Sequence, residues 1–328
     1  MSVKVRLGLL GCAKIAKRSF MPAICELSDL FEITQIASRS KAKADSFATV
    51  FGGKAVDSYD ELIDSDDVDA LYIPLPPGIR DKWIKKALLH GKHVYSEKPL
   101  TLASNKTLEL VEVSRKYDAA LIEGYTFIHH PQHRLAQELI RDGSIGEIRV
   151  FSAQFGFPSL SPQDFRYNMS VGGGVMGDAA GYPIRAALLY GGESLWVRSS
   201  YIASRESDEC SIWGSSTLQN NLGAIFNLSY CFDSAYRCTC DVWGSKGNLH
   251  LGHAFTPKPD QDTEIIISDV KGSKRILRAG SNNQFLGSAK YFYSLIKNRS
   301  LREQEFNTLM AQARLVNSLL TLSHTNTP

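Results

Sequence analysis

Residues 91–100 read Gly-Lys-His-Val-Tyr-Ser-Glu-Lys-Pro-Leu, and this stretch predicts how the chain is organised. It runs from a glycine through a short apolar alternation to a charged pair and a proline, which is typical of a strand that stops at Glu97-Lys98. Ligands of open parallel sheets bind beyond the carboxyl ends of the strands, so Lys98 can face a cleft. Pro99 has a fixed φ and no N–H, which stiffens the exit turn. The alternative is a solvated ion pair on a surface turn.

Strand-like and helix-like segments alternate on both sides of this stretch, up to residue 124. The expected strands are 3–10, 31–38, 69–75, 93–96 and 119–123, and the expected helices are 17–27, 41–51, 59–63, 79–89 and 104–117. Pro22 lies inside the first helix, where it predicts a kink or a break. Such an alternation requires a parallel sheet with helices on both faces, which is a doubly wound α/β domain.

The pattern changes after residue 124. The expected strands there are 148–157, 196–203, 209–218, 224–232, 236–243, 248–251 and 263–270, and the expected helices are 131–141, 175–190, 284–297 and 304–324. Most of these strands alternate between apolar and polar residues, which favours an antiparallel sheet with one covered face. The sequence therefore predicts a dinucleotide-binding domain over residues 1–124 and an α+β domain over residues 125–328.

The composition indicates a soluble protein that acts on small molecules. Of the 328 residues, 43% are apolar and 22% are charged, and the net charge of +3 comes from dispersed Lys and Arg, which argues against nucleic-acid binding. No signal peptide or apolar run of ~20 residues is visible, so we expect a cytoplasmic protein without membrane contact. His129, His130 and His133 have no acidic or Cys ligand at close spacing, so we expect no metal site.

Two segments favour a nucleotide site. Gly11-x-Ala13-x-x-Ala16, at the end of the first strand, is a variant of the dinucleotide fingerprint. Gly11 would make the tight turn, and the amino end of the following helix would take the pyrophosphate. The second strand ends at Ser38-Arg39 without the ribose-binding carboxylate of NAD sites, which favours NADP. The alternatives are a plain βα turn and a solvated Arg39.

Asp178 and Tyr182 are candidates for acid–base chemistry. They lie four residues apart, which on one helix would place both side chains on the same face. A phenol can protonate a developing alkoxide, and Lys98 could lower the Tyr182 pKa or donate the proton itself. Arg166 could meet a substrate phosphate or could be a plain surface arginine. Tyr182 could likewise be a packing residue of an amphipathic helix.

These motifs together resemble the glucose-fructose oxidoreductase / inositol dehydrogenase (Gfo/Idh/MocA) family. The resemblance rests, in chain order, on Gly11-Cys12-Ala13-x-Ile15-Ala16, Tyr72-Ile73-Pro74-Leu75-Pro76, Gly91-Lys92-His93-Val94-x-x-Glu97-Lys98-Pro99, Glu123-Gly124-Tyr125, His130-Pro131-Gln132, Gly172-Gly173-Gly174 and Asp178-x-x-x-Tyr182-Pro183. Within the family, the chain is most similar to NADP-dependent nucleotide-sugar 3-ketoreductases.

The resemblance implies a Rossmann domain followed by a large, mostly antiparallel open-faced sheet, with the nicotinamide between them and Lys98 beside the reacting carbon. It also implies a homo-oligomer formed through that sheet. The implied cofactor contacts are Gly11, Cys12, Ala13, Lys14, Ile15, Ser38, Arg39, Lys43, Pro74, Leu75, Glu97 and Lys98. The implied substrate contacts are Lys98, Tyr125, Arg166, Asp178 and Tyr182.

Two segments depart from the family pattern. Pro77-Gly78-Ile79-Arg80 stands where relatives commonly carry Asn and His, and Tyr182 stands where many carry a catalytic His. We therefore expect an NADP-dependent enzyme in which Lys98, Tyr182 and Asp178 act on a sugar. The expected reaction reduces a 3-keto group of a nucleotide-linked deoxysugar. The alternatives are oxidation of a free sugar, polyol or trans-dihydrodiol, and a non-catalytic dinucleotide sensor.

Overall fold

The computed structural model describes residues 3–204 and 209–324. The chain divides into two compact units, residues 1–124 with 285–310 and residues 125–284 with 311–328. Residues 285–310, which the expected division assigned to the second domain, thus fold with the first unit. Within the described residues, no helix is both long and apolar enough to cross a membrane.

The first unit is built on a six-stranded sheet whose strands all pair in parallel, in the order β3-β2-β1-β4-β5-β6. Its strands are β1 (Val5–Leu10), β2 (Phe31–Ala37), β3 (Lys54–Val56), β4 (Ala70–Ile73), β5 (His93–Ser96) and β6 (Leu121–Glu123). The expected parallel sheet is confirmed. The strand β3 was not foreseen, because three residues are too few to show an alternation.

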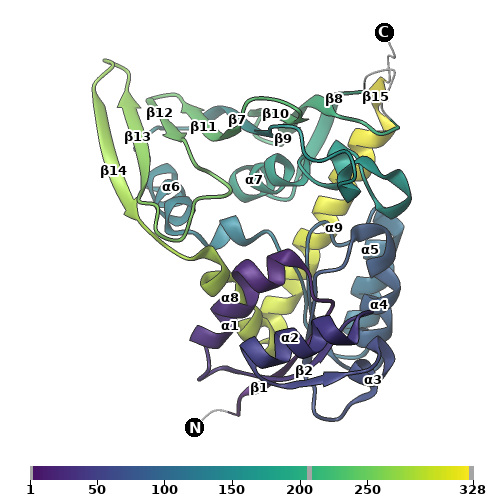
Figure 1. The fold of residues 1–328 in the computed structure, drawn as a ribbon. Helices are drawn as coiled ribbons and strands as arrows, with labels where there is room; N and C mark the ends of the chain where they lie inside the picture. Colours follow the sequence, from purple (N-terminus) through teal and green to yellow (C-terminus); the bar gives the residue numbers. More distant parts are fainter. Residues whose placement is uncertain (1–2, 205–208, 325–328) are drawn as a thin grey trace. The chain divides into compact units, whose positions relative to one another are not determined.

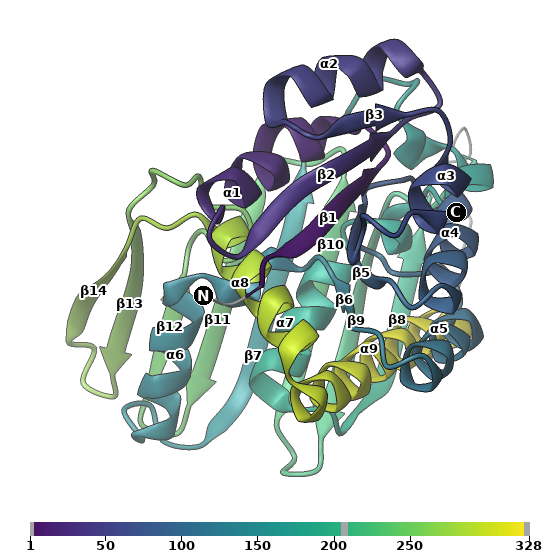
Figure 2. The ribbon, with the colours of Figure 1, turned by 90° about the horizontal axis from the view of Figure 1, so that it is seen from below.

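Helices cover both faces of this sheet, as the doubly wound fold requires. They are α1 (Met21–Glu26), α2 (Lys41–Phe51), α3 (Tyr59–Asp64), α4 (Pro77–Leu89), α5 (Ser104–Lys116), α8 (Gln284–Lys297) and α9 (Arg299–Thr321). One apolar core joins α1, α2 and α8 to the sheet, and a second joins α3, α4, α5 and the first turns of α9 to it. Figure 2 shows α1 and α2 running beside β1, β2 and β3.

The expected irregularity at Pro22 takes a specific form. Residues Ala16–Phe20 form a π-helical turn, and the regular helix α1 begins only at Met21. Pro22 is then one of the first two residues of α1, and its missing N–H faces the π-helical turn that directly precedes it.

The second unit contains a nine-stranded sheet in the order β14-β13-β12-β11-β7-β10-β9-β8-β15. Its strands are β7 (Ile148–Phe157), β8 (Leu195–Ala203), β9 (Trp213–Asn220), β10 (Ile225–Phe232), β11 (Arg237–Gly244), β12 (Gly247–Leu251), β13 (Thr263–Asp269), β14 (Lys274–Gly280) and β15 (Ser323–His324). The pairs β7–β10 and β8–β15 are parallel and the other pairs are antiparallel. A mostly antiparallel sheet is therefore confirmed.

Helices cover one face of this sheet. The helix α7 (Gly181–Gly191) packs on β7 and β10, and α6 (Pro131–Arg141) packs on β13 and β14. Figure 1 shows α6 and α7 on the same side of the strands. Along β9, β10 and β11, every second residue is buried in the core and its neighbours are partly or fully exposed. The opposite face is therefore open among the described residues.

The expected helix over residues 175–190 is wrong in its first half. Val175–Gly177 form a 3₁₀ turn, Asp178 is non-helical with φ −141° and ψ −72°, and α7 begins at Gly181. The N–H of Val175 donates to the carbonyl of Ser211 (2.8 Å), which ties the segment to a neighbouring loop. Asp178 and Tyr182 therefore do not share a face of one helix.

Candidate active site

A cavity of about 450 Å³ lies at the carboxyl ends of β1, β2 and β4 in the first unit. The residues that line it and that the sequence marked for a cofactor are Gly11, Cys12, Ala13, Ser38, Arg39, Lys43, Pro74 and Leu75. Its lining also includes Ser40, Tyr59, Pro76 and Ile79, which were not among the expected cofactor contacts. The expected contacts Lys14, Ile15, Glu97 and Lys98 are not part of this lining.

The wall of the cavity at Gly11 admits no side chain. Gly11 has φ +109°, and a Cβ atom there would lie 2.7 Å from Cδ2 of Leu75. Its N–H donates to the carbonyl of Ala37 (2.9 Å), which joins the ends of β1 and β2. The tight turn that the fingerprint predicts is thus held between two strand ends, and it leaves backbone open toward the cavity.

The polar groups of the cavity suit an anion. Arg39 and Lys43 are its cations, and none of its lining residues is an Asp or Glu. Burial raises the pKa of the Cys12 thiol to about 11, although Ser38 and Lys43 act in the opposite direction. Cys12 is therefore a neutral thiol at neutral pH, and the described lining carries no negative charge that would repel a phosphate.

Tyr59 forms one wall of the cavity. Its ring packs edge-to-face on Trp83, with centroids 5.0 Å apart. Burial raises the pKa of its hydroxyl, against the opposing charge of Arg39, so the hydroxyl stays neutral. No motif in the sequence marks Tyr59, because its position depends on how α3 packs beside β1.

The turn Glu97-Lys98-Pro99 follows β5 and is tied to three strands. The Tyr72 hydroxyl in β4 donates to the Glu97 carboxylate (2.8 Å), and the Ser96 hydroxyl in β5 donates to the Glu97 carbonyl (2.9 Å). The Glu123 carboxylate at the end of β6 accepts from the N–H of Leu100 (2.7 Å). The Lys98–Pro99 peptide bond is cis. The backbone that carries Lys98 is therefore held at both of its ends.

Arg80, in the segment that departs from the family pattern, also binds this turn. The segment forms the first turn of α4, and Arg80 donates to the carbonyls of Leu75, Glu97 and Pro99.

In the second unit, Tyr182 lies in a cluster of aromatic rings. Its ring centroid is 4.6 Å from that of Phe155, 5.5 Å from that of Tyr125 and 5.7 Å from that of Phe255. Gly181 allows this approach, because a Cβ atom there would lie 1.8 Å from the Tyr125 hydroxyl oxygen. The packing fixes the ring of Tyr182 at the start of α7, and its side chain is partly exposed.

Arg166 and Asp178 form an ion pair. Nε of Arg166 lies 2.8 Å from Oδ2 of Asp178, and Nη1 lies 3.0 Å from Oδ1 of Asp164. The expected substrate contact Arg166 is thus already engaged by two carboxylates, and Asp178 holds Arg166. The sequence did not predict this contact, since eleven residues of mostly irregular chain separate the two partners.

The three histidines lie in the second unit, and burial lowers the pKa of each to about 4. Nδ1 of His130 accepts from the N–H of Gln132, which caps α6, and Nε2 of His133 donates to the Ala254 carbonyl (2.6 Å). In the part of the chain that the structure describes, no group of His, Cys, Asp or Glu could hold a metal ion.

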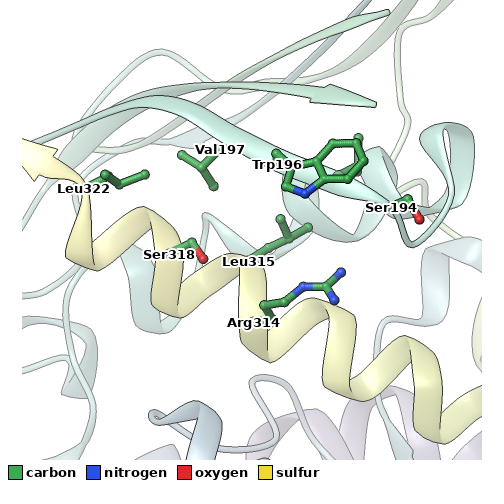
Figure 3. Close-up of a pocket in the computed structure, with 8 residues that line it drawn as sticks. Ser194, Trp196, Val197, Arg314, Leu315, Ser318 and Leu322 are labelled. Atoms are coloured by element: carbon green, nitrogen blue, oxygen red, sulfur yellow. The ribbon is translucent and has the colours of Figure 1, made fainter. Parts of the chain in front are cut away.

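A second cavity, of about 320 Å³, lies between the start of β8 and the end of α9 (Figure 3). It is lined by Ser194, Leu195, Trp196, Val197, Arg314, Leu315, Ser318 and Leu322. The Arg314 guanidinium donates to the Glu193 carbonyl (2.6 Å). None of the expected site residues lines this cavity, and its lining has no acid or base suited to proton transfer.

The expected site residues are divided between the two units. Lys98 belongs to the first unit, and Tyr125, Arg166, Asp178 and Tyr182 belong to the second. Within the second unit the structure brings Tyr125 to Tyr182 and Arg166 to Asp178. The pairing of Lys98 with Tyr182 stays a prediction.

Comparisons with known proteins place the chain in a family. Residues 5–125 match the model of an oxidoreductase family with an NAD-binding Rossmann fold, and residues 133–250 match the GFO/IDH/MocA C-terminal domain. The dTDP-3,4-didehydro-2,6-dideoxy-α-D-glucose 3-reductase of Saccharopolyspora spinosa is 41% identical over 82% of this chain and 80% of its own length. The reductase of the same name from Actinomadura kijaniata is 35% identical over 97% of this chain and 95% of its own.

A solved structure agrees with these sequence relatives. The crystal structure of a 3-ketoreductase from Actinomadura kijaniata with NADP and TDP-benzene has a TM-score of 0.93 and 34% identity, and it covers 99% of this chain and 100% of that one. That protein was also solved with a lysine changed to alanine and with a tyrosine changed to phenylalanine. The resemblance inferred from the motifs is confirmed: the chain belongs to the GFO/IDH/MocA family of oxidoreductases.

Proposed function

We propose that this protein is an NADP-dependent ketoreductase that reduces the 3-keto group of a nucleotide-linked deoxysugar. The observation that carries the proposal is the cavity of the first unit, which offers Arg39 and Lys43 but no carboxylate at the end of β2. The relatives support the substrate class, because two of them are named as dTDP-sugar 3-reductases. We also propose that residues 1–124 bind the cofactor and that residues 125–328 bind the substrate.

The residues of the cavity fit NADP. Ser38 and Arg39 would bind the 2′-phosphate, with Lys43 adding a second positive charge. The turn at Gly11 would lie against the pyrophosphate, since its missing side chain leaves the backbone accessible. When bound, NADPH supplies a hydride from C4 of its nicotinamide. Further contacts with the cofactor would come from Cys12, Ala13, Lys14, Ile15, Pro74, Leu75 and Glu97.

Lys98 and Tyr182 would supply the proton that the reduced carbonyl oxygen needs. The Lys98 ammonium would stabilise the negative charge that grows on this oxygen, and either side chain could donate the proton. The aromatic cluster around Tyr182 would hold its hydroxyl in place for the transfer. Tyr125, an expected substrate contact, is 2% exposed, so it would support the Tyr182 ring rather than reach the sugar itself.

The ion pair between Arg166 and Asp178 changes the roles that we propose for these two residues. Arg166 carries one positive charge between two carboxylates, so the trio has a net charge of −1. Asp178 would therefore orient Arg166 rather than Tyr182. A guanidinium that Asp164 and Asp178 hold rigid would present its remaining N–H donors to a substrate oxygen.

Assays of the wild-type protein and of two variants test the reaction. We expect NADPH absorbance to fall with a dTDP-linked 3-keto deoxysugar, and not to rise when NADP is mixed with free sugars, polyols or trans-dihydrodiols. Lys98→Met should lower kcat about 10²- to 10³-fold, because it removes the positive charge that stabilises the oxyanion. Tyr182→Phe keeps the ring in its cluster and should lower kcat about 10²-fold.

Full activity of Lys98→Met would contradict the mechanism. Tight NADPH binding without turnover on any of these substrates would favour the sensor alternative. We further propose that the protein is cytoplasmic and that it forms a homo-oligomer through the open face of the nine-stranded sheet.

A further inference from the structure

Arg80 is a buried arginine that donates hydrogen bonds to backbone carbonyls before and after Lys98. It is 2% exposed, and its Nε donates to the carbonyl of Leu75 (2.7 Å) at the end of β4. Its Nη1 donates to the carbonyl of Pro99 (2.6 Å) and also to the carbonyl of Glu97. One guanidinium thus binds the ends of two neighbouring strands.

The two carbonyls of the turn lie on either side of Lys98. Because one nitrogen of Arg80 binds both, the Glu97–Lys98 and Pro99–Leu100 peptide groups, which flank Lys98 and Pro99, are held relative to each other. A guanidinium is planar and its donors have fixed directions, so it can hold several acceptors in one arrangement. The Glu123 carboxylate holds the next N–H, that of Leu100 (2.7 Å). These bonds together fix the direction in which the Lys98 side chain leaves the backbone.

The same arginine contacts the wall of the cavity. Leu75, whose carbonyl it binds, lines that cavity, and so does Ile79, the residue before it. Arg80 therefore connects the proposed cofactor site with the turn of Lys98 inside one unit.

From these contacts, we propose that Arg80 is a positioning residue for Lys98. It sets the backbone of the Glu97-Lys98-Pro99 turn so that the Lys98 ammonium meets the substrate carbonyl. The inference rests on the proposed function, in which Lys98 acts on that carbonyl. A lysine at position 80 could not replace the arginine, since a single ammonium cannot span carbonyls of both strand ends in a fixed plane.

The chain offers a matched control in Arg302. This arginine belongs to the same unit and is 7% exposed. It also binds backbone carbonyls, with Nε donating to Leu295 (2.9 Å) and Nη2 to Ile296 (3.4 Å). Arg302→Lys should therefore cost stability as Arg80→Lys does, but it leaves the turn of Lys98 intact.

A double-mutant cycle tests whether Arg80 acts through Lys98. In the wild-type background, we expect Arg80→Lys to lower kcat about 100-fold, since a displacement of about 1 Å has that effect on a catalytic group. In the Lys98→Met background, the same substitution should change the residual kcat less than about 2-fold, because the ammonium group that it would displace is already absent. Arg302→Lys should lower the melting temperature but leave kcat unchanged in both backgrounds.

A second measurement does not depend on turnover. The lysines are reductively methylated with ¹³C-formaldehyde, and the methyl groups are followed by NMR. The NMR signal of Lys98 is assigned by its loss in Lys98→Met. In Arg80→Gln, which adds no amine, we expect the Lys98 signal to shift and its titration midpoint to change, with or without NADPH. In Arg302→Lys, the Lys98 signal should stay where it is.

Three results would overturn the positioning role. They are an equal fold-loss of kcat in both backgrounds, an unmoved Lys98 signal, and Arg80 variants that do not fold although Arg302→Lys does. The last result would make Arg80 a purely structural residue. Full activity of Lys98→Met would instead contradict the proposed function, so the two failures are distinguishable.

Discussion

At the scale of single residues, Arg39 provides a direct test of cofactor choice. Arg39→Ala removes a charged donor to the proposed 2′-phosphate, a kind of bond that contributes about 1.5–3 kcal/mol. We therefore expect the Kd for NADPH to rise about 10- to 100-fold and the Kd for NADH to change less than about 2-fold. Titration of nicotinamide fluorescence measures both constants.

Lys41 is the control for Arg39. Its ammonium lies 2.8 Å from the Asp57 carboxylate and is not part of the cavity lining. Lys41→Ala should leave the Kd for NADPH unchanged. An equal loss of NADPH and NADH affinity in Arg39→Ala would refute the phosphate role.

The residues of the cavity differ in how far the sequence could predict them. Gly11, Ser38 and Arg39 were foreseeable, because each lies at a fixed place after a strand of a βαβ unit. Tyr59 was not, since its ring is placed by packing on Trp83 of α4. Arg80, which lies outside the lining, was not foreseeable either, since its partners are backbone carbonyls. A carbonyl carries no residue type, so such a contact leaves no signal in a sequence.

At the scale of elements, the contact between α6 and the 253–255 loop makes the second unit sensitive to acid. Nε2 of His133 donates to the Ala254 carbonyl, so Nδ1 is the acceptor for the Tyr190 hydroxyl (2.8 Å). The neutral ring thus bonds at both nitrogens. Burial lowers the pKa of His133 from 6.5 to about 4.

This shift gives the sign of the pH dependence. The unfolded chain takes up the proton near pH 6.5 and the folded chain only near pH 4, so stability is full above pH 6.5 and falls as the pH drops. Between pH 7 and pH 5, His133 should account for a loss of about 2 kcal/mol in the free energy of unfolding. His129 and His130 shift in the same direction.

The variant His133→Gln removes the group that titrates but keeps a polar side chain of similar size in its place. The glutamine amide can donate to Ala254 and accept from Tyr190, but it does not titrate. We expect urea unfolding, followed by circular dichroism, to show a pH dependence that is smaller by about one proton between pH 7 and pH 5. An unchanged slope would show that His133 is not buried as a neutral ring.

Helices and strands were predictable where the apolar periodicity extends over many residues. They were less predictable where tertiary contacts decide where an element begins. The helices α2 and α8 begin and end where their periodicity predicts. The helix over residues 175–190 was wrong in its first half, because the Val175 N–H bonds to Ser211 and a close approach of Gly181 to Tyr125 fixes the start of α7. The strand β14 was missed, since its residues are mostly exposed and show no alternation.

At the scale of the whole molecule, the sequence did not predict that residues 285–310 fold as part of the first unit. The helix α8 completes the core of the first unit with Ala289, Phe292 and Leu295, whereas Ala311, Leu315 and Leu319 of α9 belong to the core of the second. The division therefore falls within α9. Amphipathic periodicity shows that a helix buries one face, but it does not show which core that face joins.

The open face of the nine-stranded sheet presents residues from several neighbouring strands. One row across it is apolar, because Trp243 pairs with Val150 and Val150 pairs with Ile225. The next row pairs Asp241 with Ser152 and Ser152 with Asn227, which makes it polar, and its Asp241 carboxylate lies 2.7 Å from Nδ1 of His250 in β12. Trp243 is 64% exposed and Trp213 is 37% exposed. Exposed aromatic side chains beside polar groups are typical of protein interfaces.

We therefore expect two copies of the chain to pair through this face, and the double variant Trp213→Lys/Trp243→Lys tests it. Two ammonium groups would have to be buried in the interface, so sedimentation velocity should show the wild-type oligomer replaced by monomers. Leu222→Lys is the control, because Leu222 is 85% exposed but lies in the turn between β9 and β10. The cavity of the first unit contains neither tryptophan, so the Kd for NADPH should stay constant in all variants. A monomeric wild-type protein, or an oligomer that survives both lysines, would rule out this face as the interface.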